Sequence, residues 1–334
     1  MRADALAQLM AQAGPPAEAK PARASRRRVK LALRVAAGAL VLALVVWYAR
    51  PAQLAQKLSG ANAWLFALAV FVSVCANLVS AVRWAAIARA LGLVAPTARL
   101  ALIYARGITT NILLPGATVS GDLLRSYQLA SLDNPFMRSA LSVFFDRFSG
   151  LWVLCVLSLL AVGWVALSGA SLPFGVRQVG LLWYIALLGA IVVAPLLPWP
   201  IAWLRAVPLP GIGTIALRLR ALRTRLNDAR PALIKSIWLS LVVQALSACA
   251  LWVCGSSVGL TLSYPVILAA AAPIFIMAAL PLGVAGFGTR ELAAVLVFGF
   301  LGVPGDQATA CALLFGLCAV AQGIAAAPLF LFKA

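Results

Sequence analysis

Three acidic residues lie in apolar stretches of the sequence, and each has an arginine close by. The combinations are Asp122 with Arg125, Asp146 with Arg147, and Arg290 with Glu291. The planar guanidinium group binds phosphate through paired hydrogen bonds, and a neighbouring acid can hold the arginine in place or relay a proton. These residue types therefore indicate a site for an anionic head group. The alternative is that each pair neutralises itself and joins two helices.

Glycine and proline interrupt the apolar sequence around two of these pairs. Pro115 and Gly116 open the first interruption, and Pro281 opens the second. Proline removes a backbone donor and glycine loosens a helix, so we expect the helix to break at both places. Two interrupted hydrophobic segments, one in each half of a chain, are typical of a transporter site at a repeat interface. The alternative for the second segment is a short loop at the membrane surface, with its charges in water.

The candidate binding residues come from both interruptions and from the apolar stretch between them. They are Asn111, Pro115, Gly121, Asp122, Arg125, Asp146, Arg147, Pro281, Gly286, Gly288, Arg290 and Glu291. Asn111 has a second interpretation, as a lone amide that hydrogen bonds between helices. The sequence has no histidine, which excludes Ser-His-Asp chemistry and the usual zinc sites. The six cysteines form no CxxC pair and are expected to be small apolar residues. We expect no metal site and no cofactor.

The composition indicates a polytopic membrane protein of the all-α class. Of the 334 residues, 64% are hydrophobic and 10% are charged, whereas a soluble domain is about half apolar and a quarter charged. The net charge of +19 lies mainly in a tail and in loops, as expected beside an anionic cytoplasmic leaflet. The basic runs lack interleaved aromatic residues, so nucleic acid is not an expected partner.

Two regions are predicted: a disordered basic cytoplasmic tail at 1–28 and a transmembrane domain at 29–334. The basic run that ends at Arg28 directly precedes an apolar stretch at 31–49, which places the N-terminus in the cytoplasm. A basic loop at 205–235 is predicted on the same side, where it can contact anionic lipid heads.

Further apolar segments follow along the chain. Spans of about twenty residues are expected at 62–82, 139–167, 179–197, 237–258 and 308–332. The span at 62–82 is expected to end at Arg83, with Arg83 on the cytoplasmic side and Trp84 in the interfacial aromatic belt. Shorter pieces are expected at 100–114, from the Pro115–Gly116 interruption to about residue 130, at 265–280 and at 291–303. We predict that they form two re-entrant pairs that enter from opposite faces, which is the geometry of an inverted repeat.

These same residues resemble the lysylphosphatidylglycerol synthase transmembrane-region family, a flippase-like group of integral membrane proteins. The resemblance extends from residue 31 over nearly all of the chain and rests on Pro115-Gly116…Gly121-Asp122…Arg125, on Asp146-Arg147, and on Gly286-Phe287-Gly288-Thr289-Arg290-Glu291. It implies the bacterial inner membrane and a role in moving or handling lipids or lipid-linked glycans. In bifunctional members a soluble aminoacyl-transferase domain follows this region, and none is expected after Ala334.

The resemblance and the charged residues together predict translocation of a lipid or lipid-linked glycan. The expected partner is a membrane phospholipid or a polyprenyl-linked lipid. The sequence has no nucleotide-binding motif, so we expect no ATP hydrolysis and no enzymatic activity. Two alternatives stay open. One is a membrane-embedded transferase on polyprenyl-linked sugars, with Asp122, Asp146 or Glu291 as general base. The other is a non-transporting scaffold for a lipid-modifying enzyme.

Overall fold

A computed structural model describes residues 39–40, 43–47, 51–113, 118–168, 178–193, 230–280 and 286–331. The regular structure in these ranges is helical, and no strand occurs in them, so the predicted all-α class is confirmed. The predicted tail at 1–28 and most of the first predicted span lie outside the described residues. The same holds for most of the basic loop at 205–235, and for Pro115 and Pro281.

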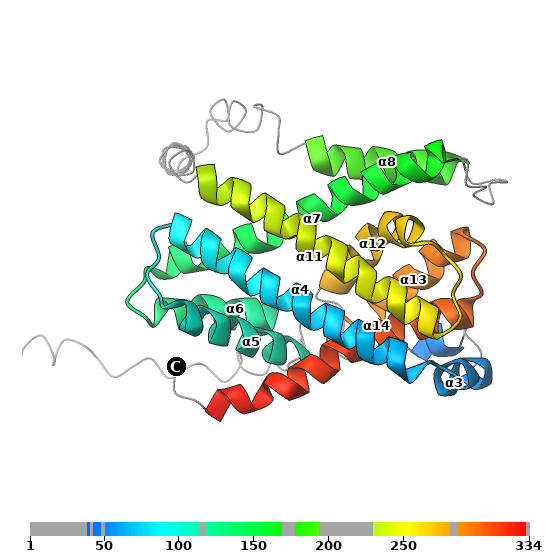
Figure 1. Cartoon of the computed structure of the whole chain (residues 1–334), viewed down its shortest axis with the longest axis horizontal. Helices are drawn as coiled ribbons and strands as arrows, with labels where there is room; N and C mark the ends of the chain where they lie inside the picture. The colour runs from blue at the N-terminus through cyan, green and yellow to red at the C-terminus, as the bar shows by residue number, and fades with distance from the viewer. Residues whose placement is uncertain are drawn as a thin grey trace, which may run out of the picture.

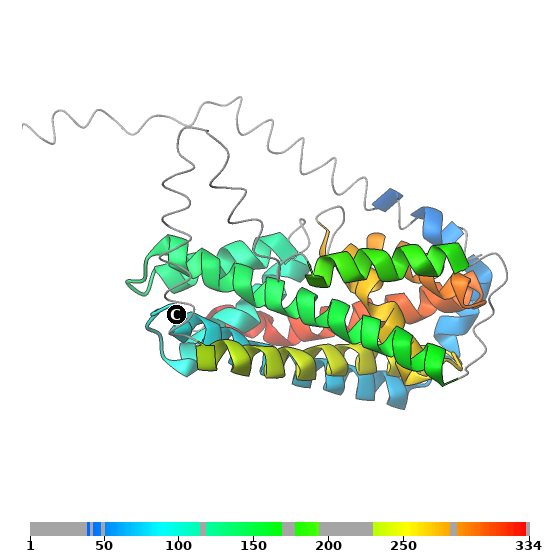
Figure 2. The ribbon, with the colours of Figure 1, turned by 90° about the horizontal axis from the view of Figure 1, so that it is seen from above.

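Four long helices form the body of the protein. They are α4 (Ala63–Ala90), α7 (Phe136–Leu167), α11 (Arg230–Ser257) and α14 (Gly305–Ala326), which continues into the short 3-10 helix η2 (Ala327–Leu331). Each includes a stretch that is long and apolar enough to cross a hydrocarbon core of about 30 Å. Helices α4 and α11 lie side by side, and α7 and α14 pack against both of them (Figures 1 and 2). The chain is therefore a multi-pass membrane protein.

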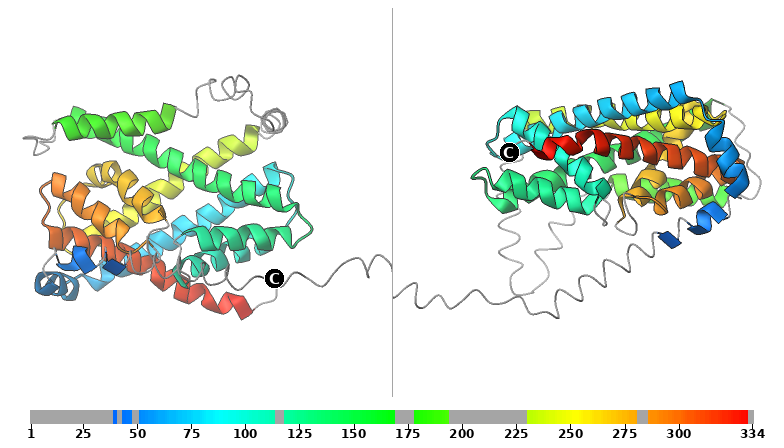
Figure 3. Two further views of the ribbon diagram at one scale, coloured as in Figure 1. Left: turned by 180° about the vertical axis from the view of Figure 1, so that it is seen from behind. Right: turned by 90° about the horizontal axis from the view of Figure 1, so that it is seen from below.

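Two pairs of shorter helices pack against these long helices in the described part of the chain. The first pair is α5 (Thr97–Leu113) and α6 (Thr118–Ala130), and the second is α12 (Tyr264–Ala279) and α13 (Thr289–Phe300). In both pairs the first helix ends and the second begins where glycine and proline predicted an interruption of the helix. The two pairs lie at opposite ends of the long helices, as both the front view and the view from behind show (Figures 1 and 3). That each pair enters a membrane from its own side stays a prediction.

The two halves of the described bundle repeat one pattern of helix contacts. Helices α4 to α7 correspond in order to α11 to α14, and the first three helices of each set have similar lengths, whereas α7 has 32 residues and α14 has 22. Helix α7 packs against α6 and α12, and α14 packs against the corresponding helices, α13 and α5. Helices α4 and α11 likewise each pack against the short helix that follows them and against both α7 and α14. Two halves of a repeat would share contacts in this way, although the inverted repeat itself stays a prediction.

The end of α4 differs from the prediction. The sequence predicted a span that ends at Arg83, but α4 continues to Ala90, and both Arg83 and Trp84 are buried inside the bundle. Neither residue needs the membrane interface, because a carboxylate of α7 neutralises Arg83 and the indole N–H of Trp84 donates to Ser142 Oγ at 3.1 Å. Within the described ranges, two further helices lie outside the repeated pattern: α3 (Pro51–Ser59) packs against α14, and α8 (Gln178–Val193) packs against α7.

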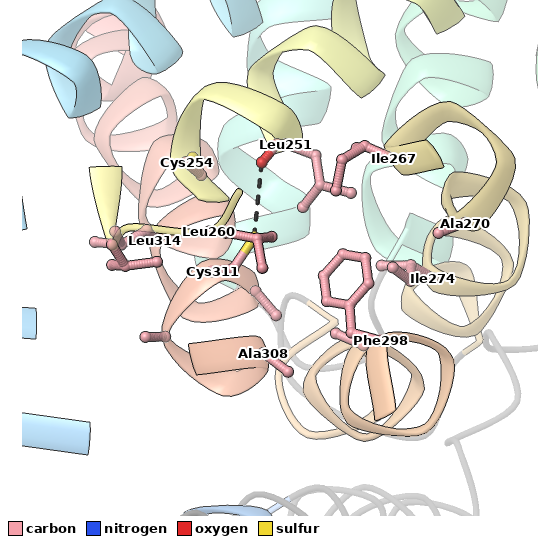
Figure 4. Close-up of a cluster of buried hydrophobic side chains, with 14 of the residues drawn as sticks. Leu251, Cys254, Leu260, Ile267, Ala270, Ile274, Phe298, Ala308, Cys311 and Leu314 are labelled. Carbon is pink, nitrogen blue, oxygen red and sulfur yellow. Dashed lines mark hydrogen bonds between the residues drawn. The ribbon is translucent and has the colours of Figure 1, made fainter. Parts of the chain in front are cut away.

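An apolar core holds the second short pair in place. Most of its buried side chains come from α11, α12, α13 and α14, with one each from α3 and α4. Figure 4 shows Phe298 of α13 pointing toward the side chains of α11 and α12. Cys311 Sγ donates to the carbonyl of Leu251 at 3.6 Å, and the sulfur atoms of Cys254 and Cys318 lie 3.8 Å apart. All six cysteines are free, and four of them are buried, which agrees with their expected role as small apolar residues.

Candidate functional site

Asp146 of α7 is the centre of a buried charged cluster. Its Oδ1 accepts a hydrogen bond of 2.9 Å from Arg83 Nε, and its Oδ2 accepts one of 2.8 Å from Arg125 Nη2. All three side chains are buried. Arg83 also donates to Ser240 Oγ of α11 at 3.1 Å. One carboxylate therefore joins α4 to α6 and α7, and Arg83 extends the cluster to α11.

Arg83 is a member of the cluster that the sequence analysis missed. Its guanidinium group lies against Gly150 of α7, where a Cβ atom would come within 2.9 Å of Nη1. The Gly150 carbonyl in turn accepts a hydrogen bond of 2.9 Å from Gln244 Nε2. One signal could have revealed this position: the residues at 84–88 that follow Arg83 are entirely apolar. A helix that ended at the interface would have no need of them.

Arg125 of α6 is held by aromatic rings as well as by Asp146. Its guanidinium carbon lies 4.3 Å from the ring centroid of Trp84 and 4.5 Å from that of Tyr104. These distances are within the range of cation–π attraction, which strengthens when the cation is desolvated. The expectation that Trp84 belongs to an interfacial belt is therefore wrong. The ring instead stabilises a buried arginine.

Asp122 and Arg147 form the partly exposed part of the same cluster. Arg147 Nε and Nη2 each lie 2.9 Å from one oxygen of Asp122, and the side chains of Arg147 and Asp122 are 39% and 21% exposed. Asp122 also lies 3.6 Å from Arg125 Nη1, which is the contact expected from their spacing. The expected pairing of Asp146 with Arg147 is not found. Consecutive residues of a helix point about 100° apart, so these two side chains meet different partners.

The first interruption brings two backbones into close contact. Asn111 Oδ1, at the end of α5, accepts a hydrogen bond of 2.7 Å from the backbone N–H of Gly121 on α6. A Cβ atom at Gly121 would overlap the carbonyl oxygen of Gly107. Of the two interpretations of Asn111, the structure supports the hydrogen bond between helices. This contact fixes the start of α6 and so the positions of Asp122 and Arg125.

The second interruption ends in a turn that only glycine adopts readily. Gly286 and Gly288 have φ angles of 78° and 93°, a region that side chains with a Cβ atom avoid. Glu291 Oε2 accepts a hydrogen bond of 2.6 Å from Gly288 N, which satisfies a free donor at the start of α13. Glu291 Oε1 accepts from Arg290 Nε at 3.0 Å and from Nη2 at 2.8 Å. The expected contact between Arg290 and Glu291 is therefore present.

This second pair is sealed inside the protein. Arg290 and Glu291 are both buried. The guanidinium carbon of Arg290 lies 4.7 Å from the ring centroid of Phe287. Gly316 of α14 lies directly against the guanidinium group, and a Cβ atom there would overlap Nη2. The alternative of a wet surface loop does not describe these two residues.

Both interrupted helix pairs pack against the same helix, α14. Near the end of α5, Thr109 Oγ1 donates to the carbonyl of Gly323 at 3.1 Å, and Ile112 packs against the same glycine. At the start of α13, Arg290 packs against Gly316. Gly316 and Gly323 are two turns apart on α14, or about 10 Å at the rise of an α-helix. No ion pair joins the two charged clusters among the residues that the structure describes.

The two clusters differ in charge. The first contains three arginines and two aspartates, whereas the second contains one arginine and one glutamate. Arginine keeps its proton in proteins, so the first cluster carries an excess positive charge when its aspartates are ionised. Within the described parts of the chain, no three histidine, cysteine, aspartate or glutamate side chains are grouped so that they could hold a metal ion. The arrangement is suited to binding an anion.

The fold and the charged clusters define a helical, multi-pass membrane protein with ionic side chains at two interrupted helix pairs. Its family is given by a match to the family model described as the lysylphosphatidylglycerol synthase transmembrane region, over residues 31–327. Because this match spans most of the chain, the protein belongs to that family and is a membrane protein of the flippase-like kind. No curated protein matches the chain.

Proposed function

We propose that the protein moves a lipid or a lipid-linked glycan across the bacterial inner membrane. The observation that carries this proposal is the meeting of both interrupted helix pairs on α14, each with an arginine and an acid beside the interruption. Ionisable groups inside a membrane bundle are costly, and they usually mark a substrate path or relay. Family membership supports the same function.

In this proposal the polar head group binds at the interrupted helices while the acyl or prenyl chains stay in the membrane. The partner is a membrane phospholipid or a polyprenyl-linked lipid. The protein acts as a translocator and not as an enzyme. Its N-terminus lies in the cytoplasm, where the basic segments also contact anionic lipid heads.

The test is mass spectrometry of the lipids that stay bound to the purified protein. We expect one lipid class to be enriched in the wild type over the bulk membrane. It should be depleted in Arg290→Ala and in Glu291→Gln, which disturb the second interrupted pair. Arg138→Ala is the control, because Arg138 lies on α7 eight residues before Asp146, or about 12 Å along the helix. If all four proteins retained the same bulk phospholipids, the head-group site would be wrong, and a scaffold role would take its place.

A further inference from the structure

The first charged cluster has one more cation than anion. Among the residues that the structure describes, the acidic partners of Arg83, Arg125 and Arg147 are Asp122 and Asp146. Two of these arginines already have partners in the interior: Arg83 lies between Asp146 and Ser240, and Arg125 lies between Asp146 and two aromatic rings, although the buried Nε of Arg125 has no hydrogen-bond partner in the described part of the chain. A low-dielectric interior makes an uncompensated charge expensive. An anion from outside the protein would balance the cluster.

Arg147 is the member of the cluster that an outside anion can reach. Its side chain is 39% exposed, against 3% for Arg125 and 6% for Arg83. It is the twelfth residue of the 32-residue helix α7 and thus lies about 7 Å from the middle of that helix. An exposed arginine at this depth is unfavourable in hydrocarbon, and it becomes favourable beside a phosphate.

The surface around this pair is apolar. Phe144, three positions before Arg147, and Val119, three positions before Asp122, are both exposed neighbours on the same helix faces. Phe148 is also exposed, and its ring stacks with that of Phe144 at a centroid distance of 6.1 Å. A free inorganic anion would gain nothing from these side chains. A lipid would place its phosphate on Arg147 and its chains along the phenylalanines.

We propose that Arg147 binds the phosphate of an anionic phospholipid and that Asp122 is the intramolecular counter-ion which this phosphate displaces in part. This inference rests on the proposed function and adds the charge of the substrate and the residue that contacts it. Asp146, Arg83 and Arg125 are positioning residues, because they fix α6 against α7 without an open face of their own.

The two members of the exposed pair have opposite predicted effects. Arg147→Gln removes the cation that binds phosphate, and we expect binding of anionic lipid to weaken by roughly tenfold, as for the loss of a charge-assisted hydrogen bond. Asp122→Asn removes the competing anion, so binding should strengthen. Arg147→Lys keeps the charge but loses the planar fork, and its binding should lie between those of wild type and Arg147→Gln. A pair that only joins two helices would weaken binding in both Arg147→Gln and Asp122→Asn.

The measurement is native mass spectrometry of the full chain from nanodiscs of phosphatidylcholine and phosphatidylglycerol in equal amounts. Phosphatidylglycerol is the probe because it has a single negative phosphodiester and a neutral head. Arg138→Gln, on the same helix, is the control. Opposite shifts for Arg147→Gln and Asp122→Asn support the inference. Equal shifts, no shifts, or a thermal stabilisation by inorganic phosphate as large as that by the lipid would overturn it.

Failure of the inference can be told apart from failure of the proposed function. Translocation that proceeds equally well with neutral lipid and in Arg147→Gln would overturn the inference and leave the proposed function standing. Binding of phosphatidylglycerol with the predicted opposite shifts, but without any translocation in liposomes, would overturn the proposed function alone.

Discussion

Arg125 donates a hydrogen bond of 2.8 Å to Asp146, and this contact joins α6, the helix after the first interruption, to the long helix α7. The same carboxylate binds Arg83 of α4 through its other oxygen. Removing one partner from a buried ionic cluster leaves the others uncompensated, which is strongly destabilising. Asp146 is therefore the residue on which the geometry of the first cluster depends most.

We predict that Asp146→Asn destabilises the protein strongly, by about 3 kcal/mol or more, because two buried arginines lose their anion. The measurement is thermal unfolding of the purified protein in detergent. Asp133→Asn is the matched control. Asp133 is exposed in a turn with a φ angle of 59°, which asparagine also adopts. Similar unfolding temperatures for the two variants would show that Asp146 does not hold the cluster together.

Gly121→Ala is predicted to force α5 and α6 apart. The added Cβ atom would overlap the Gly107 carbonyl and press on Asn111. We expect a cost of about 1–3 kcal/mol, typical of overpacking, together with loss of lipid binding because Asp122 and Arg125 move with α6. Gly163→Ala is the control, since a Cβ atom there meets nothing within 4 Å. If both variants unfolded and bound lipid alike, the close contact of α5 with α6 would be without consequence.

The contact of Gly316 with Arg290 makes a corresponding prediction for the second interruption. In Gly316→Ala the new Cβ atom would overlap the guanidinium group, so Arg290 must leave Glu291 or α13 must shift. We expect lower thermal stability and reduced lipid retention. Gly299→Ala, whose Cβ atom would meet nothing within 4 Å, should leave both unchanged. A silent Gly316→Ala would mean that the Arg290 side chain is free to move.

The placement of the two short pairs predicts the topology. Val94 and Asn134 exchange hydrogen bonds of 2.9 and 3.0 Å, so the turns before α5 and after α6 lie together. Epitope tags inserted at residues 95 and 133 should be accessible from the cytoplasm. Tags inserted at residues 260 and 303, at the other end of the bundle (Figure 1), should be accessible only from the outside. If positions 133 and 260 were accessible from the same side, the two short helix pairs would not enter the membrane from opposite sides.

Much of this architecture could be predicted from the sequence, because local chemistry decides it. The lengths of the apolar stretches predicted the ends of the long helices to within a few residues, except for the C-terminal end of α4 and the N-terminal turns of α11. Glycine and proline marked both breaks, since they act on the backbone where they stand. The contact between Arg290 and Glu291 was also predicted correctly, because the two residues are neighbours.

The partners of the first cluster could not be predicted in the same way. Spacing along the chain suggested Asp146 with Arg147, whereas the partners of Asp146 come from α4 and α6. Arg83 resembled a residue at a membrane interface because its counter-ion lies 63 positions away. Trp84 was assigned to the interface for the same reason, because its partners Arg125 and Ser142 lie on other helices. Contacts of this kind depend on how the helices pack against one another, and a local sequence pattern does not determine that packing.

Translocation in liposomes tests the central claim most directly. The wild type, Arg147→Gln and Gly163→Ala would each be reconstituted with a phosphatidylglycerol labelled on its head group, and an impermeant quencher would report the label left inside. The account predicts that the wild type and Gly163→Ala expose the inner label to the quencher, and that Arg147→Gln does so much more slowly. Quenching limited to the outer leaflet with the wild type, as in protein-free liposomes, would contradict it.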